Sequence, residues 1–266
     1  MSQRLARIAA RTVEILHSGE YEARTGTRVV IAEQIARAVA GTRLYLPDDA
    51  LPVVVPPAPG PIEVEVTDES TLEAGRRLGE GVAALVFASA RNPGGGFLTG
   101  AKAQEEDVAR ASALYRCLTA VPEFYAHHRA ERDLRYTDRV IYSPEVPVFR
   151  SPDNDLLEQP YRLSFLTAAA PNLGALLDRQ PELAGTVPAV LEARAERVLR
   201  VAAAHGHRRI VLGAWGCGVF RNSPEVVAAA FRTGLARVPY FEHVTFAILD
   251  RTGATLRAFQ ETFAAP

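Results

Sequence analysis

The chain has 266 residues, of which 30 are basic and 31 acidic, with 48% hydrophobic residues and a formal net charge of -1. This composition is typical of a soluble globular protein and excludes a disordered or collagen-like chain. A net charge this small also excludes nucleic-acid binding through an overall basic field, so any nucleotide has to be held by a local site. We expect neither DNA nor a membrane as a partner, because no apolar run approaches the roughly 20 residues that span a bilayer.

The first 60 residues are predicted to form a helical extension followed by a proline-rich connector. Helical spacing of apolar residues predicts two helices, each closed by a glycine: residues 3–18 with Gly19, and Ala32–Val39 with Gly41. The stretch from Leu46 to Pro61 contains too much proline for a helix interior or a central strand. We therefore expect an internal boundary, with residues 1–60 as the extension and connector and residues 61–266 as the main core, in one compact unit.

After the connector, strand-like and helix-like segments alternate, which is typical of an α/β sheet. Apolar runs predict strands at Ile62–Val66, Ala83–Ala88, Arg139–Tyr142, Arg162–Ala168, Arg209–Ala214 and Val244–Leu249. Helical patterns lie at Thr71–Leu78, Lys102–Leu118, Val187–Ala204, Pro224–Ala236 and Ala254–Phe263. The segment from Pro122 to Gln159 has charge-rich and proline-containing stretches, and we expect an irregular, lid-like insertion there.

Two glycine clusters follow predicted strands, at Asn92–Gly96 and Gly213–Phe220. Neither fits a familiar nucleotide loop, because GxxxxGK[ST] is absent and GxGxxG fails at its last glycine. Either cluster alone is equally consistent with a turn or with a ligand loop. Two of them at strand ends of an α/β sheet favour a binding crevice. After the second cluster, Asn222 or Ser223 can cap a helix starting at Pro224, whose amides and dipole suit an anion.

An acidic run opens the predicted helix that follows the first cluster, at Gln104-Glu105-Glu106-Asp107. Carboxylates in a first turn stabilise a helix by about 0.3–1 kcal/mol, which by itself can explain the run. The run follows the glycines by only seven residues, however, so we expect a carboxyl group to face the same crevice. Adjacent helical residues point about 100° apart, so Glu105 and Glu106 are expected to have different roles.

The order of these motifs resembles a known signature. Gly-Gly-Gly, seven residues and Gln-Glu-Glu, at Gly94–Gly96 and Gln104–Glu106, is similar to the signature of poly(ADP-ribose) glycohydrolases of the short bacterial type. The later GAWGCGVFRN stretch resembles the diphosphate loop of that family. The likeness runs from the Arg28–Val39 region through the final helix. It implies a macrodomain-like fold, a three-layer α/β/α sandwich around a mixed sheet, with the N-terminal helices as an extension.

The resemblance also implies the site residues. The expected catalytic residues are Glu106, as the acid, and Glu105, which together with Asn92 is expected to hold the ribose hydroxyls at the scissile end. The expected substrate-binding residues are Asn92, Gly94, Gly95, Gly96, Gln104, Gly216, Cys217, Gly218, Val219 and Phe220. Within this set, the glycines of the first loop let the substrate approach the backbone, the amides of residues 216–219 wrap the diphosphate, and Phe220 packs on the distal ribose. Thr67 or Asp68 is the expected adenine contact.

The implied reaction is hydrolysis of the ribose–ribose O-glycosidic bond of poly(ADP-ribose), which passes through an oxocarbenium-like transition state that a carboxylic acid can assist. The resemblance further implies exo action on polymer or poly(ADP-ribosyl)ated protein, with ADP-ribose as the product. The alternatives are a non-catalytic ADP-ribose-binding macrodomain and a mono-ADP-ribosyl hydrolase; the failed GxGxxG disfavours a Rossmann dehydrogenase.

No metal or other cofactor is expected. Cys117 and Cys217 match neither a disulfide framework nor a metal-ligand spacing, and the N-terminus lacks the apolar stretch of a signal peptide, so we expect a cytoplasmic protein.

Overall fold

The computed structural model describes residues 1–52, 60–250 and 252–264 of the chain. Its strands are β1 (Glu20–Glu22), β2 (Arg28–Val30), β3 (Arg43–Tyr45), β4 (Glu63–Thr67), β5 (Val82–Phe87), β6 (Val140–Arg150), β7 (Leu156–Ala168), β8 (Arg209–Leu212) and β9 (His243–Ala247). Its α-helices are α1 (Gln3–Ser18), α2 (Ala32–Gly41), α3 (Thr71–Leu78), α4 (Gln104–Ala111), α5 (Leu114–Thr119), α6 (Pro122–Ala130), α7 (Leu173–Arg179), α8 (Pro181–Ala184), α9 (Val187–Ala204), α10 (Pro224–Arg237) and α11 (Ala254–Phe263). A short 3-10 helix, η1, covers Phe97–Thr99.

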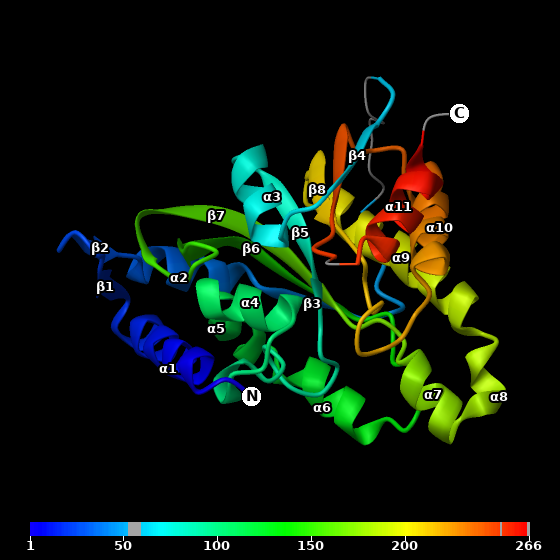
Figure 1. Cartoon of the computed structure of the whole chain (residues 1–266), viewed down its shortest axis with the longest axis horizontal. Coiled ribbons are helices and arrows are strands. Elements are labelled where there is room, and N and C mark those ends of the chain that lie inside the picture. Colours follow the sequence, from blue (N-terminus) through cyan, green and yellow to red (C-terminus); the bar gives the residue numbers. More distant parts are fainter. Residues whose placement is uncertain (53–59, 251, 265–266) are drawn as a thin grey trace.

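A seven-stranded mixed sheet in the order β3-β6-β7-β5-β8-β9-β4 forms the centre of the molecule (Figure 1). The strands from β7 to β4 run parallel to one another, whereas β6 is antiparallel to both of its neighbours. β1 and β2 form a separate antiparallel pair. Because the parallel strands end at one edge of the sheet, the loops that follow them meet there.

Helices cover both faces of the sheet, which gives the three-layer α/β/α sandwich that was expected. Along β5, Leu85 belongs to the hydrophobic cluster that includes Phe231 of α10, whereas Val86 belongs to the cluster that includes Leu114 of α5. This alternation is the period-two pattern of a strand whose faces are both buried. In Figure 1, α9, α10 and α11 lie on one side of the sheet, and α2, α4 and α5 on the other.

The predicted helices at residues 3–18, 71–78, 187–204 and 254–263 are confirmed as α1, α3, α9 and α11. Gly19 ends α1 in the left-handed conformation, with φ 74°. The second predicted helix differs slightly, because α2 continues through Gly41 and is capped by Thr42. The predicted strands agree with the structure to within two residues except at Arg139–Tyr142, where β6 continues to residue 150, and at Arg162–Ala168, where β7 starts at residue 156.

The long helix predicted over Lys102–Leu118 is wrong, because the chain breaks into α4 and α5. Ser112 has an extended backbone, with φ -138° and ψ 176°, and forms an isolated β-bridge with Val148 of β6. The next amide, of Ala113, donates to the Pro147 carbonyl at 3.0 Å. Pairing with a strand distant in the sequence therefore interrupts a helical pattern that is continuous along the chain.

The irregular insertion predicted over Pro122–Gln159 is also wrong, since this segment contains α6, β6 and the start of β7. Pro144 and Pro147 lie inside β6, and proline is expected mainly at strand edges and bulges. The register between β6 and β7 shifts between Ser143 and Val146, with Glu145 at φ 45° between them. Pro144 lies in this bulge, whereas Pro147 pairs in register with Arg162. The two prolines made one of the longest strands unrecognisable in the sequence pattern.

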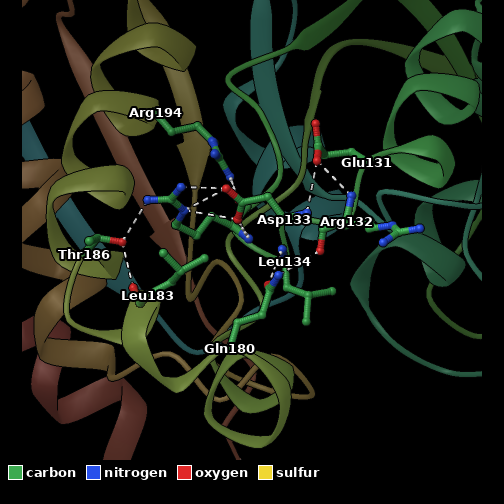
Figure 2. Close-up of polar contacts among 9 residues, drawn as sticks. Glu131, Arg132, Asp133, Leu134, Gln180, Leu183, Thr186 and Arg194 are labelled. Carbon is green, nitrogen blue, oxygen red and sulfur yellow. Dashed lines mark hydrogen bonds and ion pairs between the residues drawn. The ribbon is translucent and has the colours of Figure 1, made fainter.

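The loop between α6 and β6 is anchored by hydrogen bonds to the layer of α7, α8 and α9 (Figure 2). The Gln180 side chain accepts from the Leu134 amide at 3.0 Å and donates to the Arg132 carbonyl at 3.2 Å. Buried Arg194 of α9 donates to the Arg135 carbonyl at 2.9 Å. Because its backbone groups are bound at several points, this loop is a fixed part of the fold rather than the lid that was expected.

The N-terminal helices pack into the same core as the sheet. Ile15 of α1 and Ile35 of α2 belong to the hydrophobic cluster that contains Val86 of β5. The connector predicted over Leu46–Pro61 is described only in part, because residues 53–59 lie outside the described residues. The division into residues 1–60 and 61–266 stays a prediction.

Candidate active site

Both glycine loops start at the same edge of the sheet. The first follows β5 and the second follows β8, and these strands are parallel neighbours with Ala83 opposite Ile210. Neighbouring parallel strands deliver their following loops side by side, so the crevice predicted from the two clusters lies at the carboxyl ends of β5 and β8.

Gln104 joins the start of α4 to the end of β5. Its side-chain oxygen accepts from the Phe87 amide at 2.9 Å, and its side-chain nitrogen donates to the Leu85 carbonyl at 2.8 Å and to Thr71 Oγ1 at 3.0 Å. All three bonds go to protein groups, so in this structure Gln104 fixes the position of α4. Its contact with substrate stays a prediction.

Glu105 is buried beneath the first loop, with only 3% of its surface exposed. Its Oε2 accepts from the Ser89 amide at 2.6 Å, whereas its Oε1 has no hydrogen-bond partner among the described residues. Burial raises the pKa of this carboxyl group well above its usual range, opposed in part by the Ser89 amide and supported by the neighbouring Glu106 charge. Glu105 therefore retains a proton more readily than an exposed glutamate.

Glu106 is half-buried and supports the backbone of the glycine loop. Its Oε1 accepts from the Gly96 amide at 2.8 Å. Gly95 has φ 59°, and a Cβ atom there would collide with Glu106 Oε1 and lie 2.9 Å from its Cδ. Packing within the protein therefore requires glycine at position 95, because the loop and the Glu106 carboxylate fit together only when residue 95 has no side chain.

The third acid of the run, Asp107, is directed elsewhere. Its carboxylate forms an ion pair with Arg110 one turn further along α4, and Arg110 also donates to the Ala101 carbonyl at 2.8 Å. Arg110 is buried and Asp107 is half-exposed. The acidic run therefore divides into two carboxyl groups beside the glycine loop and one structural ion pair.

The second loop is held by buried polar contacts around Trp215 and Asn222. The Trp215 indole donates to the Ala168 carbonyl at 3.0 Å, and the Asn222 side chain donates to the Gly216 carbonyl at 3.2 Å. Gly216 has φ 73°, and a Cβ atom there would lie 2.6 Å from the Ala170 Cβ. Of the two expected caps for α10, Ser223 is the N-cap, accepting from the Val226 amide at 3.4 Å.

The amides of residues 216–219 have different partners. The Cys217 amide donates to the Ala214 carbonyl at 3.1 Å, whereas within the described part of the chain those of Gly216, Gly218 and Val219 donate to no backbone carbonyl. Val219 is 85% exposed. Free amides in a glycine-rich loop before a helix suit a phosphate group, which agrees with the expected diphosphate role but does not test it.

Cys217 is half-buried on the same loop, and burial raises the pKa of its thiol to about 12. A thiol with so high a pKa is not a thiolate at neutral pH, which argues against a cysteine nucleophile here. Phe220 lies beside Tyr136, with 6.1 Å between the ring centroids, and its carbonyl accepts from the Gly174 amide at 2.9 Å.

The remaining expected contacts lie at the same edge of the sheet. Asn92 is exposed, and its carbonyl accepts from the Gly95 amide at 3.0 Å. Thr67 ends β4, with a buried Oγ1 that has no partner among the described residues, and the next residue, Asp68, is exposed. In the sheet β4 lies two strand positions from β8, so Thr67 and Asp68 lie farther along this edge from the second glycine loop. The adenine role stays a prediction.

Two residues near Glu105 were not anticipated. Ser89 contributes its backbone amide, which carries no signal in the sequence. Tyr125 of α6 is buried, its hydroxyl has no hydrogen-bond partner among the described residues, and its pKa is raised by burial and by the Glu105 charge. Because α6 lies in the segment expected to be irregular, nothing in the sequence placed this tyrosine near the carboxylates.

Within the described residues, no group of three or more His, Cys, Asp and Glu side chains is placed to hold a metal ion. Of the helices in the described ranges, none combines the length and the apolar character needed to cross a membrane.

The raised pKa of Glu105 predicts a pH-dependent effect of Glu105→Gln on stability. The unfolded chain releases this proton near pH 4.3, whereas the folded chain keeps it to a higher pH, so this group makes the wild type less stable as pH rises above about 4.3. Glutamine removes that titration and can still accept from Ser89. We expect the free energy of unfolding of the variant, relative to wild type, to increase between pH 5 and pH 8.

Urea denaturation at pH 5 and pH 8 measures the free energy of unfolding of the variant and the wild type. The control is Glu123→Gln on α6, which makes the same replacement at an exposed carboxylate. A relative stability of Glu105→Gln that does not change with pH would show that the pKa of Glu105 is not raised.

Several comparisons agree in pointing to one family. A family model for the catalytic domain of microbial-type poly(ADP-ribose) glycohydrolase (PARG) matches residues 9–151. The crystal structure of PARG from Thermomonospora curvata is 46% identical, covers 98% of this chain and 100% of its own, and superposes with a TM-score of 0.89. The same protein bound to the inhibitor ADP-HPD gives a TM-score of 0.86. PARG from Deinococcus radiodurans in complex with ADP-ribose is 42% identical, covering 86% of this chain and 97% of its own, with a TM-score of 0.79. No protein with a curated description matches.

Proposed function

The chain belongs to the microbial-type poly(ADP-ribose) glycohydrolases, and on this premise we propose that it removes ADP-ribose from the polymer end with Glu106 as the general acid and base. The membership makes it a glycosidase that hydrolyses poly(ADP-ribose). The position of Glu106 supports this role. Glu106 is half-buried, and its carboxylate accepts from the Gly96 amide of the first glycine loop.

The proposed reaction begins with proton transfer. Glu106 protonates the oxygen of the departing ribose, the glycosidic bond breaks with its electron pair on that oxygen, and an oxocarbenium ion remains on the terminal unit. The ionised Glu106 then takes a proton from a water molecule as that water attacks the cation, which restores the acid. Each turnover consumes one water molecule and leaves Glu106 protonated as it began.

Other residues are proposed to bind and orient the terminal unit. The Gly96 amide holds one oxygen of Glu106 and so fixes the direction of its proton. Glu105, with its unpaired buried oxygen, is proposed to hold a ribose hydroxyl together with Asn92. The amides of Gly216, Gly218 and Val219 are proposed to bind the diphosphate, where fixed dipoles bind an anion without reorganising.

The product is expected to be ADP-ribose, the molecule bound in the Deinococcus radiodurans structure. We propose poly(ADP-ribosyl)ated protein as the physiological substrate. We also propose that the enzyme works in the cytoplasm, a setting that agrees with its free cysteines Cys117 and Cys217.

Product analysis over time tests the exo mode of action. Poly(ADP-ribosyl)ated protein is incubated with the chain and the released material is separated by length. Exo action predicts free ADP-ribose from the earliest time points, with the polymer shortening gradually. Early release of oligomers would contradict it. Mono-ADP-ribosylated protein is the parallel substrate, and its turnover in place of polymer would favour the mono-ADP-ribosyl hydrolase alternative.

A further inference from the structure

A cavity of about 380 Å³ lies beside α3, where the far ends of β6 and β7 extend past it. Its lining includes Leu72, Arg76, Arg77, Arg150, Ser151 and Tyr161. Both β6 and β7 continue beyond the short parallel strands, and Figure 1 shows α3 over the sheet beside this extension. None of the residues assigned above to the catalytic or diphosphate loops lines this cavity.

Arg150, the last residue of β6, is the unusual member of the lining. It is only 5% exposed and forms no ion pair with a carboxylate in the described part of the chain. Its Nε donates to Thr12 Oγ1 at 3.2 Å and its Nη1 to the Asn154 carbonyl at 2.9 Å, whereas Nη2 has no partner among the described residues. Burial lowers the pKa of this guanidinium to about 10, opposed in part by the charge of Asp155, and a buried guanidinium without an ion-paired carboxylate is costly.

A second guanidinium at the cavity also lacks a carboxylate. Arg76 lies over the Tyr161 ring at 5.7 Å and has no ion pair among the described residues. Arg77, in contrast, is neutralised by Glu65 and Glu69, each at 2.6 Å. The cavity is therefore lined by two arginines that form no direct ion pair with a carboxylate among the described residues, and Asp155 opposes the charge of Arg150 only in part.

The one acid in the lining is already engaged. Glu73 accepts from the Ser70 amide at 2.9 Å and completes the capping box that starts α3. Its carboxylate is bound at the start of the helix and forms no ion pair with Arg76 or Arg150 in the described part of the chain. The cavity therefore has guanidinium groups available to an anion.

We propose that this cavity binds a phosphate group, and that the group is a diphosphate of the polymer outside the terminal unit. The second part rests on the proposed function. Arginine binds phosphate oxygens through its planar fork of donors, and each further unit of poly(ADP-ribose) carries a diphosphate. Binding there lets the enzyme hold polymer as well as its terminal unit.

The cavity lies towards the opposite end of the sheet from the glycine loops, because Tyr161 precedes Ser164, the partner of Ala83 near the start of β5. A polymer held at both places therefore has to extend along α3. The Leu72 carbonyl accepts from the Tyr161 hydroxyl at 3.0 Å inside the cavity wall. The preceding residue, Thr71, accepts from Gln104, which begins the helix that carries Glu105 and Glu106. The first turn of α3 thus separates the cavity from the start of the catalytic helix.

Calorimetric titration with inorganic pyrophosphate tests the site directly. The full chain is first saturated with ADP-ribose, so that the catalytic crevice is filled, and pyrophosphate is then added. We expect one further binding event, weakened about tenfold or more in Arg76→Gln, because the variant loses a charged hydrogen bond to the phosphate. Arg150→Gln tests the buried group, with its melting temperature measured to establish that it folds. Arg232→Gln on α10, which packs on the opposite face of the sheet, is the matched control and is expected to bind like wild type.

Kinetics then identify the source of the phosphate. Two substrates are compared: long polymer, and a synthetic ADP-ribosyl glycoside whose leaving group has no phosphate. If the cavity holds polymer, KM for polymer rises about tenfold in Arg76→Gln, while KM for the glycoside is unchanged. Lost pyrophosphate binding with unchanged KM for polymer would assign the cavity to free phosphate compounds and overturn the polymer assignment.

If pyrophosphate does not bind to the chain saturated with ADP-ribose, the cavity is not a phosphate site. Equal pyrophosphate binding by Arg76→Gln, Arg150→Gln and Arg232→Gln would overturn the proposal in the same way. That failure is separate from failure of the proposed function, which appears as wild-type chain that releases no ADP-ribose from polymer. The pyrophosphate titration gives its result whether or not the chain turns polymer over.

Discussion

Replacement of Glu106 by glutamine is expected to lower kcat for polymer cleavage by about 10²–10⁴-fold, the range of a general acid and base. The carboxamide has nearly the same shape and its oxygen can still accept from the Gly96 amide, so the loop is expected to keep its conformation. It has no acidic proton to give to the departing ribose and no carboxylate to take one from water. Release of ADP-ribose from poly(ADP-ribosyl)ated protein measures kcat, and calorimetry with ADP-ribose checks that the variant still binds.

The control for this variant is Glu123→Gln, which removes a carboxylate from the first turn of α6 in the same way. It is expected to retain kcat, because Glu123 is exposed and belongs to neither loop. A Glu106→Gln enzyme with kcat within a few-fold of wild type would remove Glu106 from the acid-base role. If Glu105→Gln lost turnover instead, that role would pass to Glu105.

Glu105 is the alternative candidate for the general acid and base, because a raised pKa is a property that a general acid needs. Its environment argues against the full role. A group that first gives a proton to the substrate and then takes one from water has to be reached by water, and Glu105 is almost completely buried. Glu106 is half-buried and accepts from the Gly96 amide of the first glycine loop. A protonated Glu105 is better suited to hold a ribose hydroxyl at a fixed position.

The parts of the fold that the sequence predicts well depend on neighbours along the chain. The start of α10 at Ser223 and Pro224 and the end of α1 at Gly19 are set by local capping, which residue type reveals directly. The two glycine loops were also recognisable, because two glycine clusters at strand ends of one α/β sheet favour a binding crevice, although either alone is equally consistent with a turn. Most of the expected site residues lie together at one sheet edge for this reason.

The parts that were missed depend on contacts between distant segments. The break at Ser112 follows from its pairing with Val148, and β6 contains Pro144 at a bulge where the register with β7 shifts. The environment of Glu105 likewise depends on the Ser89 amide and on Tyr125, which reaches the site from α6. No pattern of neighbouring residues in the sequence indicates such contacts. The burial of Arg150 is not apparent from the sequence for the same reason.

Gly95→Ala is expected to lower kcat about 10²-fold even though it changes no group that takes part in the chemistry. A methyl group at this position collides with the Glu106 carboxylate, so either the loop or the catalytic side chain has to move. Displacement of a catalytic group by about 1 Å is enough for a loss of that size. The left-handed backbone at φ 59° adds about 1–2 kcal/mol of strain for any residue with a side chain, which lowers stability as well.

The strain and the collision can be separated with Gly206→Ala. Gly206 has φ 81°, and a Cβ atom there would have no neighbour within 4 Å, so this variant carries the backbone strain without a clash near the carboxylates. Both variants are expected to lose similar stability in urea denaturation, but only Gly95→Ala is expected to lose kcat. Equal kcat in the two would mean that Glu106 does not depend on the space left by Gly95, and that the triple glycine serves the approach of substrate alone. Loss of kcat in Gly95→Ala alone would instead show that the loop glycines also set the position of the catalytic acid.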